Sequence, residues 1–179
     1  MTEFKKHIET NKKAWNKRTP IHIKSKFYNN EEFKKGKDSL KPIELNAIGD
    51  VKGKSLLHLQ CHFGQDSISF ARMGAKVTGV DFSDAAINEA KRIAAEMNMH
   101  VNFIESNVLD LKLNKEFDII FSSYGVIGWL PDLDKWAATI ATHLKKGGLF
   151  LLTEFHPFLE LIKDNGYDYF YDPKPDIEI

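Results

Sequence analysis

The middle of the chain alternates between short apolar runs and amphipathic segments. Apolar runs at 55–60, 76–80, 101–104, 117–122 and 149–153 have the length and hydrophobicity of buried strands. Between them, apolar positions recur three or four residues apart, a spacing typical of helices that bury one face. This alternation predicts an α/β fold, with a parallel sheet of about five strands, right-handed crossovers and helices on both faces.

Two of the helices are predicted in detail. The segment after 80 begins at Ser83, a natural N-cap, and buries a stripe of period 3.6. A second helix opens at Pro131 and ends at the Lys145–Gly148 stretch, where cations and glycines favour a helix stop. Its expected buried face is made of Leu133, Trp136, Ala137, Ile140 and Leu144.

The first fifty residues are more polar. Helical spacing over 2–18 predicts a mostly exposed helix that ends before Thr19-Pro20, because the residue before a proline disfavours the helical region. The charged stretch 24–41 predicts a loop or short helix that lies over the domain without entering its core. Pro42 suits the first turn of another short helix, which Gly49 ends.

The stretch 55–81 predicts a strand, a turn containing Gly64, a helix, and a second strand that stops at Asp81. A βαβ unit of this size binds nucleotide-like molecules, since the helix start offers free N–H groups and the acidic tip can hold a ribose diol. The carboxyl ends of parallel strands meet at one edge of the sheet. Candidate functional residues are therefore expected mainly in the loops that follow the five strands.

Composition narrows the class of protein. Lys and Arg total 25, as do Asp and Glu, and this balance argues against a dedicated nucleic-acid binder. The chain starts without the apolar core of a signal peptide and shows no apolar run long enough to cross a bilayer. Cys61, the single cysteine, excludes an intrachain disulfide and a cysteine-cluster metal site. We expect a cytoplasmic protein without a metal, a nucleic-acid partner or a membrane partner.

Five motifs in a fixed order carry a family resemblance. LLHLQCHFG, VTGVDFS, FDIIFSSYG and LKKGGLFLLTEFHP, with the segment around Asn107, resemble class I S-adenosylmethionine (SAM)-dependent methyltransferases of the Rossmann-like type. HLQCHFGQD, with NKKAWNKRTPIH upstream and SSYGVIGWLPDL downstream, is similar to one bacterial subgroup. The glycine loop departs from the family pattern: His58 stands at the usual acidic position, and Gln60 and His62 stand where two glycines are usual.

The resemblance implies a three-layer Rossmann-like sandwich and a division into three parts. Residues 1–50 form an N-terminal helical lid, 51–156 the SAM-binding core, and 157–179 an aromatic, extended tail. The antiparallel hairpin that usually closes such a sheet does not fit in 157–179, so the chain looks truncated. Strand five then becomes an exposed edge, covered by the tail or by pairing of two chains as a homodimer.

The same resemblance implies roles for the strand tips. Asp81 is expected to bind the ribose hydroxyls, although a carboxylate that caps the next helix is the alternative. Phe82 packs on adenine or in the core, and Asn107 accepts from the adenine amino group or caps a turn. The remaining cofactor contacts are assigned to Gln60, Cys61 and Gly64 beneath the methionyl part, the Val108 backbone at the ring, and Ser123 beside the sulfonium.

Tyr124 is the candidate for the transfer site, either near the cationic sulfur or orienting the acceptor, and the alternative is a buried aromatic at a strand end. Glu154 and His156, at the tip of strand five, are an acid/base-capable pair or a simple turn arrangement. The lid segment is expected to contribute aromatic and basic side chains that close over the cofactor or form part of the substrate pocket, namely Trp15, Arg18, His22 and Tyr28. The alternative is that they are solvated charges and surface aromatics.

The implied activity is in-line transfer of a methyl group from SAM to an O, N, S or C atom of a small-molecule acceptor, with S-adenosyl-L-homocysteine (SAH) as product. Two alternatives remain open. A non-catalytic, methyltransferase-like binding module would explain the unusual loop. A nicotinamide-dependent oxidoreductase would share the strand–turn–helix–acid pattern, but this chain lacks the Gly-x-Gly-x-x-Gly motif of that class.

Overall fold

The computed structural model describes residues 3–156, and its centre is one sheet of five parallel strands in the order β3-β2-β1-β4-β5. This confirms the predicted α/β class and the Rossmann-like sandwich. The order reverses between β1 and β4, which places a topological switch point at the carboxyl ends of these two strands. The strands are β1 (Ser55–Leu59), β2 (Lys76–Asp81), β3 (Asn102–Glu105), β4 (Phe117–Ser123) and β5 (Leu144–Thr153).

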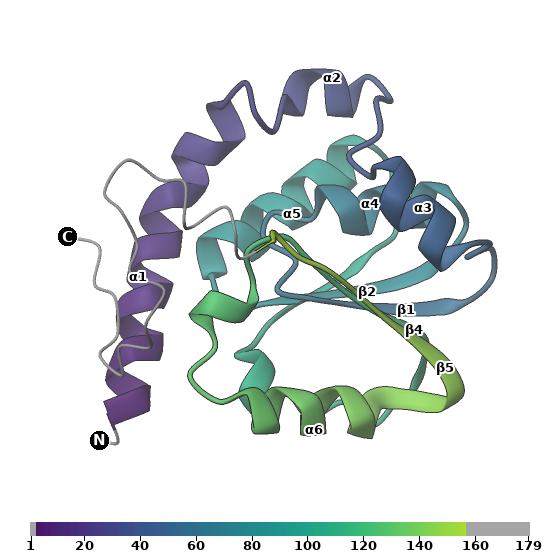
Figure 1. The fold of residues 1–179 in the computed structure, drawn as a ribbon. Helices are drawn as coiled ribbons and strands as arrows, with labels where there is room; N and C mark the ends of the chain where they lie inside the picture. Colours follow the sequence, from purple (N-terminus) through teal and green to yellow (C-terminus); the bar gives the residue numbers. More distant parts are fainter. Residues whose placement is uncertain (1–2, 157–179) are drawn as a thin grey trace.

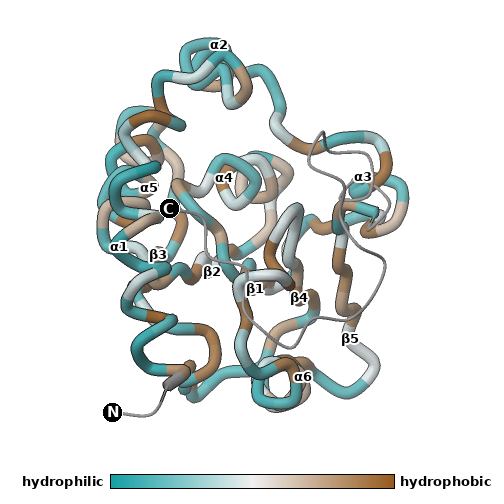
Figure 2. The backbone as a smooth tube through the Cα atoms, turned by 60° about the vertical axis from the view of Figure 1, so that its left-hand side comes forward, coloured by the Kyte–Doolittle hydropathy of each residue, from teal (hydrophilic) through white to brown (hydrophobic). Residues whose placement is uncertain are grey.

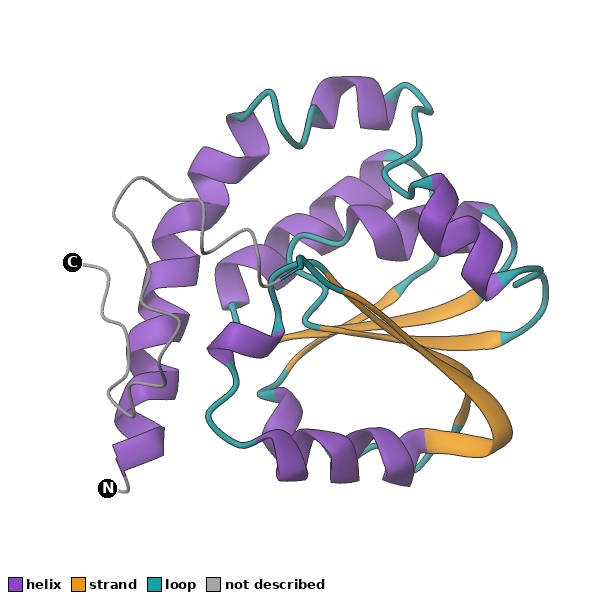
Figure 3. Ribbon diagram, in the orientation of Figure 1, coloured by secondary structure: helices purple, strands orange, loops and turns teal. Residues whose placement is uncertain are grey.

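Helices cover both faces of the sheet. In Figures 1 and 3, α3, α4 and α5 lie on one face and α6 on the other, while α1 stands across the end of the sheet. The elements are α1 (Glu3–Lys24), α2 (Asn30–Lys34), α3 (Pro42–Ile48), α4 (Gln65–Arg72), α5 (Asp84–Glu96) and α6 (Leu133–His143), with short 3₁₀ turns η1 (Val108–Asp110) and η2 (Ile127–Trp129).

The core follows the sequence pattern closely. The hydrophobic colour runs along β3, β4 and β5 in Figure 2, and β1 is buried along its whole length. Ser83 caps α5 as predicted, since its side chain accepts the Ala86 N–H bond. Gly49 ends α3, also as predicted.

The first helix is longer than predicted, because α1 continues through Pro20 to Lys24. The expectation that it ends before Thr19-Pro20 is wrong. Thr19 is buried, and its hydroxyl donates to the Trp15 carbonyl at 2.9 Å. Trp15 before the proline and His22 after it both contact His62, so contacts on both sides of the proline hold one continuous helix. Packing has outweighed the local cost of an interior proline.

The predicted buried face of α6 is rotated in the structure. Leu133 and Ala137 are exposed, whereas Thr139 and His143 are buried beside Trp136. The Thr139 hydroxyl donates to the Val108 carbonyl at 3.0 Å, and the Leu113 N–H donates to the His143 ring at 3.0 Å. Polar side chains face inward here because they satisfy backbone groups of a neighbouring loop.

The end of α6 also differs from the prediction. The helix stops at His143, and the Lys145–Gly148 stretch belongs to β5 instead of terminating the helix. A register irregularity between Phe117 and Ile119 of β4 accommodates these extra residues. The predicted tail, 157–179, lies outside the described residues.

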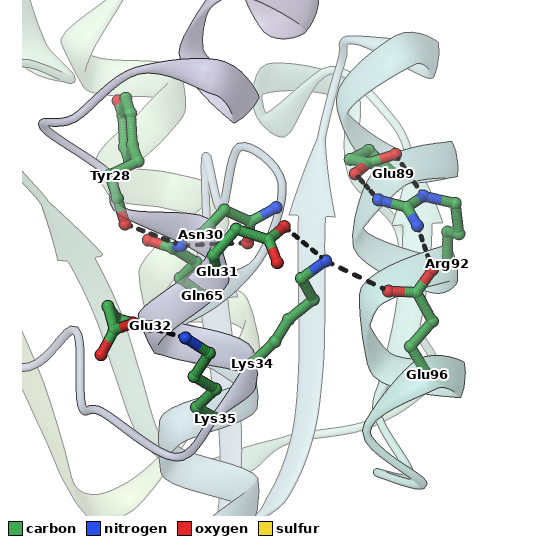
Figure 4. A network of polar contacts seen from close by, with 10 residues as sticks. All are labelled: Tyr28, Asn30, Glu31, Glu32, Lys34, Lys35, Gln65, Glu89, Arg92 and Glu96. Atoms are coloured by element: carbon green, nitrogen blue, oxygen red, sulfur yellow. Dashed lines mark hydrogen bonds and ion pairs between the residues drawn. The ribbon is translucent and has the colours of Figure 1, made fainter.

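The segment between α1 and α3 contributes to the core, contrary to expectation. Phe33 of α2 is 3% exposed and belongs to the cluster that α5 and β3 form. Figure 4 shows how this segment is fixed: Gln65, at the start of α4, donates to the Tyr28 carbonyl at 3.1 Å, and Lys34 pairs with Glu96 of α5 at 3.7 Å. The segment is thus docked on the helices that follow β1 and β2.

Candidate functional site

Asp81 lies at the carboxyl end of β2, buried, with both carboxylate oxygens bonded to the backbone. Oδ2 accepts the His62 N–H at 2.8 Å, and Oδ1 accepts the Ser83 N–H at 2.9 Å. Burial raises its pKa to about 6, although the backbone bonds act in the opposite direction. The carboxylate therefore holds the loop after β1 and the start of α5 together. Each oxygen keeps a second lone pair for a further donor.

The loop after β1 adopts the backbone of a glycine loop without its glycines. Gln60 has φ +56° and His62 has φ +49°, both in the left-handed region where glycine is usually found. Such a conformation costs on the order of 1 kcal/mol or more for each non-glycine residue. The departure from the family pattern is therefore confined to side chains, and contacts of these side chains must offset the backbone cost.

The Gln60 side chain bridges the switch point. Its amide nitrogen donates to the Val126 carbonyl at 3.2 Å, and its amide oxygen accepts from the Ser122 hydroxyl at 3.4 Å. These bonds connect the tip of β1 to the tip of β4 and the loop beyond it. The position assigned to the methionyl part of a cofactor is thus bordered by an amide that is already bonded on both sides.

His62 lies at the centre of an aromatic group that joins the lid segment to the loop after β1. Its Nε2 shares a hydrogen bond with Nδ1 of His22 at 3.0 Å, and its ring lies edge-on to Trp15 and Tyr28, with centroid distances of 5.2 and 5.6 Å. Burial and the adjacent His22 lower the pKa of His62 to about 3. Burial, with the Arg18 charge as the lesser cause, also lowers the pKa of His22. Both rings are neutral at pH 7.

Trp129 extends this group from η2. It lies edge-on to Trp15 with a centroid distance of 5.5 Å, and the Arg18 guanidinium lies over its ring at 5.2 Å. Trp129 thus ties the loop after β4 to α1. Trp15, Arg18, His22 and Tyr28, four residues proposed for the lid, are thus brought together over the carboxyl edge.

Polar contacts extend the cover of α1 to β2 and β3. Lys12 pairs with Glu105 at 2.6 Å and with Asp84 at 3.4 Å, and Asn16 donates to Asp84 at 2.8 Å. The Ser83 hydroxyl donates to Asn16 at 2.6 Å. Lys12 and Asn16 were not singled out from the sequence, because a polar residue on an amphipathic helix carries no signal of what it faces.

Gly64 and Cys61 have structural reasons for their identity. Gly64 is the N-cap of α4 with φ +78°, and a Cβ there would lie 2.6 Å from the Phe103 ring. The Cys61 thiol is buried in the core near Gly79, and burial raises its pKa. A cofactor contact at these two positions therefore falls to backbone atoms.

The loop after β3 lies beside Asp81, since the Ser106 N–H donates to the Asp81 carbonyl at 2.9 Å. Asn107 caps η1: its side-chain oxygen accepts the Leu109 N–H at 3.1 Å, and its amide donates to Asp110 at 3.1 Å. Val108 is buried, and Phe82 is half-buried beside Asp81. The turn role weighed for Asn107 is present in the structure, and its adenine role stays a prediction.

Tyr124 and Ser123 end β4 within a second polar group, formed with the N-termini of α3 and α4. The Tyr124 hydroxyl donates to the buried Glu44 carboxylate, and the Lys41 ammonium lies 4.1 Å from the centroid of the tyrosine ring. Ser123 donates to Asp66 at 3.2 Å. Burial and the Glu44 contact raise the pKa of Tyr124, so its phenol stays protonated.

Glu44 is the member of this group that sequence reasoning missed. It closes a capping box, because its carboxylate accepts the Lys41 N–H at 2.7 Å. A glutamate two positions after a proline at a helix start is a visible signal of such a box. Nothing in the pattern indicates that the same carboxylate also reaches the tip of β4.

Glu154, at the tip of β5, is bonded to the backbone. Glu154 accepts N–H bonds from four backbone groups: Gly125, Val126 at 2.9 Å, Ile127 at 3.2 Å and Phe155 at 2.8 Å. Burial opposes its ionisation, but these bonds together lower its pKa. Glu154 therefore fixes the loop after β4, and the turn arrangement weighed for this tip is what the structure contains. His156 is exposed.

His58 stands in β1 at the family's acidic position and faces α4. It is 2% exposed, with Nδ1 hydrogen-bonded to the Ser67 hydroxyl at 2.8 Å and Nε2 buried without a partner. Burial lowers its pKa to about 3. A neutral imidazole thus takes the place of a carboxylate, which removes one negative charge from beneath the loop after β1.

Within residues 3–156, no three His, Cys, Asp or Glu side chains are grouped closely enough to hold a metal ion. In the same range, no helix is long and apolar enough to cross a membrane.

The chain resembles known proteins along its central part. It is 33% identical over 119 residues to a ubiquinone biosynthesis O-methyltransferase of Coxiella burnetii (64% of this chain, 50% of that one). The protein of that name from Shewanella pealeana is 38% identical over 72 residues (38% and 30%). The chain thus spans half, or less, of the length of these curated relatives.

Among solved structures, the PH0226 protein from Pyrococcus horikoshii OT3 matches with a TM-score of 0.62 and 24% identity, over 78% of this chain and 63% of that one. The glycopeptide N-methyltransferase MtfA complexed with SAM matches with a TM-score of 0.55 and 24% identity, over 62% and 50%. At this identity the likeness shows the fold. The family model described as "Methyltransferase domain" matches residues 56–148, more than half of the chain, and the chain therefore belongs to the methyltransferase-domain family.

Proposed function

We propose that this chain binds SAM at the carboxyl edge of its sheet and transfers the methyl group to a small-molecule acceptor. The observation that carries the proposal is Asp81, a buried carboxylate at the tip of β2, directly beside the β1 loop and the β3 tip. Relatives named as O-methyltransferases, and the MtfA structure with bound SAM, support the assignment of the cofactor.

The residues present fit this cofactor by their chemistry. The free lone pairs of Asp81 can accept from ribose hydroxyls, and the aromatic group around Trp15 and His62 offers apolar faces at the same edge. Asn107 and the Val108 backbone would take the adenine ring, and Ser123 would lie near the sulfur. Gln60, Cys61 and Gly64 would support the methionyl part, the latter two through backbone atoms.

The cofactor supplies an activated methyl group, so the chain's own residues have mainly to position the acceptor and exclude water. In this proposal Trp15, His22 and Tyr28 cover the reacting edge, and Arg18 offers a cation for a carboxylate. His156 stays a proposed substrate contact. Residues 1–50 then act as a lid on a core of residues 51–156.

Tyr124 is proposed to orient the acceptor. Its O–H is committed to Glu44, so the lone pairs of its oxygen remain to accept a hydrogen bond from an acceptor hydroxyl or amine. Tyr124→Phe removes this oxygen, together with its bond to Glu44, and keeps the ring. Turnover should fall by roughly tenfold, as expected for one hydrogen bond in the transition state, and SAM affinity should stay unchanged. Equal turnover in the variant would contradict the role.

Calorimetric titration with SAM, SAH and NADH tests the cofactor assignment. Binding of SAM and SAH without NADH supports it. An absence of SAM binding at millimolar concentration would favour a non-catalytic binding module, and selective NADH binding would favour an oxidoreductase. The module is the second candidate because the bonded Gln60 side chain borders the methionyl position.

Asp81→Asn tests the ribose contact with less damage than alanine, because its amide oxygen keeps an acceptor for one of the His62 and Ser83 N–H groups, whereas alanine would leave both without one. We expect at least a tenfold loss of SAM affinity, about 1.4 kcal/mol, in a variant whose thermal unfolding is still cooperative. Asp134→Asn, at an exposed site in the first turn of α6, is the matched control and should bind normally. Normal binding by folded Asp81→Asn would sink the ribose assignment.

A homodimer through β5 also stays a proposal. Among the described strands β5 has one neighbour, β4, and its Leu149 is 39% exposed. Unpaired strand edges favour pairing with a second chain. Light scattering at high protein concentration decides the matter, because a monomeric mass there excludes the dimer.

A further inference from the structure

The balanced total charge hides a strong local asymmetry. The first 26 residues carry eight Lys and Arg against two Glu, and the remaining residues carry 17 Lys and Arg against 23 Asp and Glu. Most of the first 26 residues form α1, which stands across the carboxyl edge of the sheet (Figure 1). The basic charge is therefore concentrated at one end of the molecule, over the candidate site.

The two faces of α1 differ in kind. The inner face makes the contacts described above through Lys12, Trp15, Asn16, Thr19 and His22. On the outer face, exposed residues recur at the spacing of one helical stripe. This outer face of α1, with the two exposed residues that follow the helix, consists of Lys6, Lys13, Lys17, Ile21, Lys24, Lys26 and Phe27.

The lysines of this face are not committed to partners in the fold. Between residues 3 and 156, the side-chain ammonium of none of the five makes an ion pair or a hydrogen bond, whereas Lys12 on the inner face makes two ion pairs. Glu9 is the one carboxylate among the exposed side chains of residues 4–27. A stripe of unpaired cations on a helix attracts a polyanionic surface.

Two large apolar side chains at the C-terminal end of the stripe identify that surface. Ile21 is 68% exposed and Phe27 is 80% exposed, and they alternate with Lys17, Lys24 and Lys26. Nucleic-acid backbones offer nothing to an aliphatic side chain. Interfacial helices combine lysines at headgroup level with aliphatic and aromatic residues that enter the acyl boundary.

We propose that the outer face of α1 docks on an anionic phospholipid bilayer, with Ile21 and Phe27 entering the interface and the lysines contacting the headgroups. Each lysine close to such a surface strengthens partitioning of the protein onto the bilayer about fivefold. The lysines of the outer face together can therefore hold the protein on the bilayer without a membrane-spanning segment. In this orientation the inner face of α1 separates the bilayer from the candidate site. The docking does not depend on methyl transfer.

Vesicle co-sedimentation of the full chain tests the proposal. Vesicles of equal parts phosphatidylcholine and phosphatidylglycerol should bind the protein, and pure phosphatidylcholine should bind it at least tenfold more weakly. The triple variant Lys13→Glu/Lys17→Glu/Lys24→Glu should lose binding by about a hundredfold or more. The double variant Ile21→Ser/Phe27→Ser keeps the charge and should lose about tenfold or more.

The control is Lys52→Glu/Lys112→Glu/Lys146→Glu, which makes the same change in net charge at exposed positions outside α1. It should bind within about threefold of wild type, since headgroup attraction falls off within a Debye length. Circular dichroism confirms folding of each variant. Equal loss in the control would show that net charge alone acts. Unchanged binding of the Ile21/Phe27 variant, with a DNA duplex competing fully, would identify a general polyanion site and overturn the proposal.

Discussion

His58 gives the sharpest prediction of acid sensitivity. Its pKa is about 3 in the folded chain and 6.5 in a model peptide, because protonation would bury a charge at Nε2 with no partner. Between these two values the unfolded chain binds a proton that the folded chain does not. Stability contributed by the neutral ring is therefore present above pH 6.5 and is lost as the pH falls toward 3.

The magnitude follows from the two pKa values. A pH of about 5 lies about 1.5 units below the pKa of the histidine in the unfolded chain, and each unit is worth about 1.36 kcal/mol. The free energy of unfolding should therefore fall by about 2 kcal/mol relative to pH 7. His58→Gln keeps a neutral side chain that can bond to Ser67 and cannot titrate. We expect the variant, whatever its stability at about pH 7, to lose about 2 kcal/mol less than wild type on acidification.

The assay is urea unfolding followed by tryptophan fluorescence at both pH values. His100→Gln, at an exposed site beyond α5, is the matched control and should show the wild-type loss. His62 contributes equally to all three proteins and cancels in the comparison. If His58→Gln loses as much stability as wild type on acidification, the argument from burial is wrong.

Two further substitutions test particular contacts. In urea unfolding, Gly64→Ala should destabilise the protein by about 1–3 kcal/mol more than Gly53→Ala. The two glycines share φ near +77°, but a Cβ at Gly64 would strike Phe103, whereas one at Gly53 meets nothing within 4 Å. Equal losses in the two variants would contradict the steric argument. Glu154→Gln should cost about 1–3 kcal/mol at neutral pH, since an amide offers one acceptor oxygen to backbone groups that now use two. Because the folded-state pKa of Glu154 lies below its ordinary value of 4.5, wild type keeps this advantage above pH 4.5 and loses it as the pH falls further, through the folded-state pKa. The two proteins should therefore converge in acid, and a constant gap would contradict the assignment.

The sheet was predictable because its signal is local. Four of the apolar runs became strands with bounds near those expected, whereas β5 begins at Leu144 instead of Leu149. Ser83 and Gly49 act at the helix ends where their chemistry places them. The helix stop at Pro20 failed because a local preference met long-range packing: Trp15 and His22, on either side of the proline, both contact the loop after β1.

The site was less predictable, since its contacts join distant segments. The buried face of α6 was misjudged because Thr139 and His143 are inward as hydrogen-bonding groups, which hydrophobic periodicity does not detect. Glu44 escaped notice because its bond to Tyr124 joins residues that are 80 positions apart in the sequence. For Glu154 both an acid/base role and a turn arrangement were expected, and its contacts with backbone groups of the loop after β4 match the second.

The left-handed residues in the loop after β1 also bear on the order of folding. A glycine loop adopts its shape from local backbone freedom, and can form as soon as the flanking strand and helix meet. Here the shape at Gln60 and His62 depends on Val126, 66 positions later, and on His22, 40 positions earlier. Contacts of such separation form late, because their closure entropy must be offset first. The loop should therefore be among the last parts of the domain to order, after the sheet that carries it.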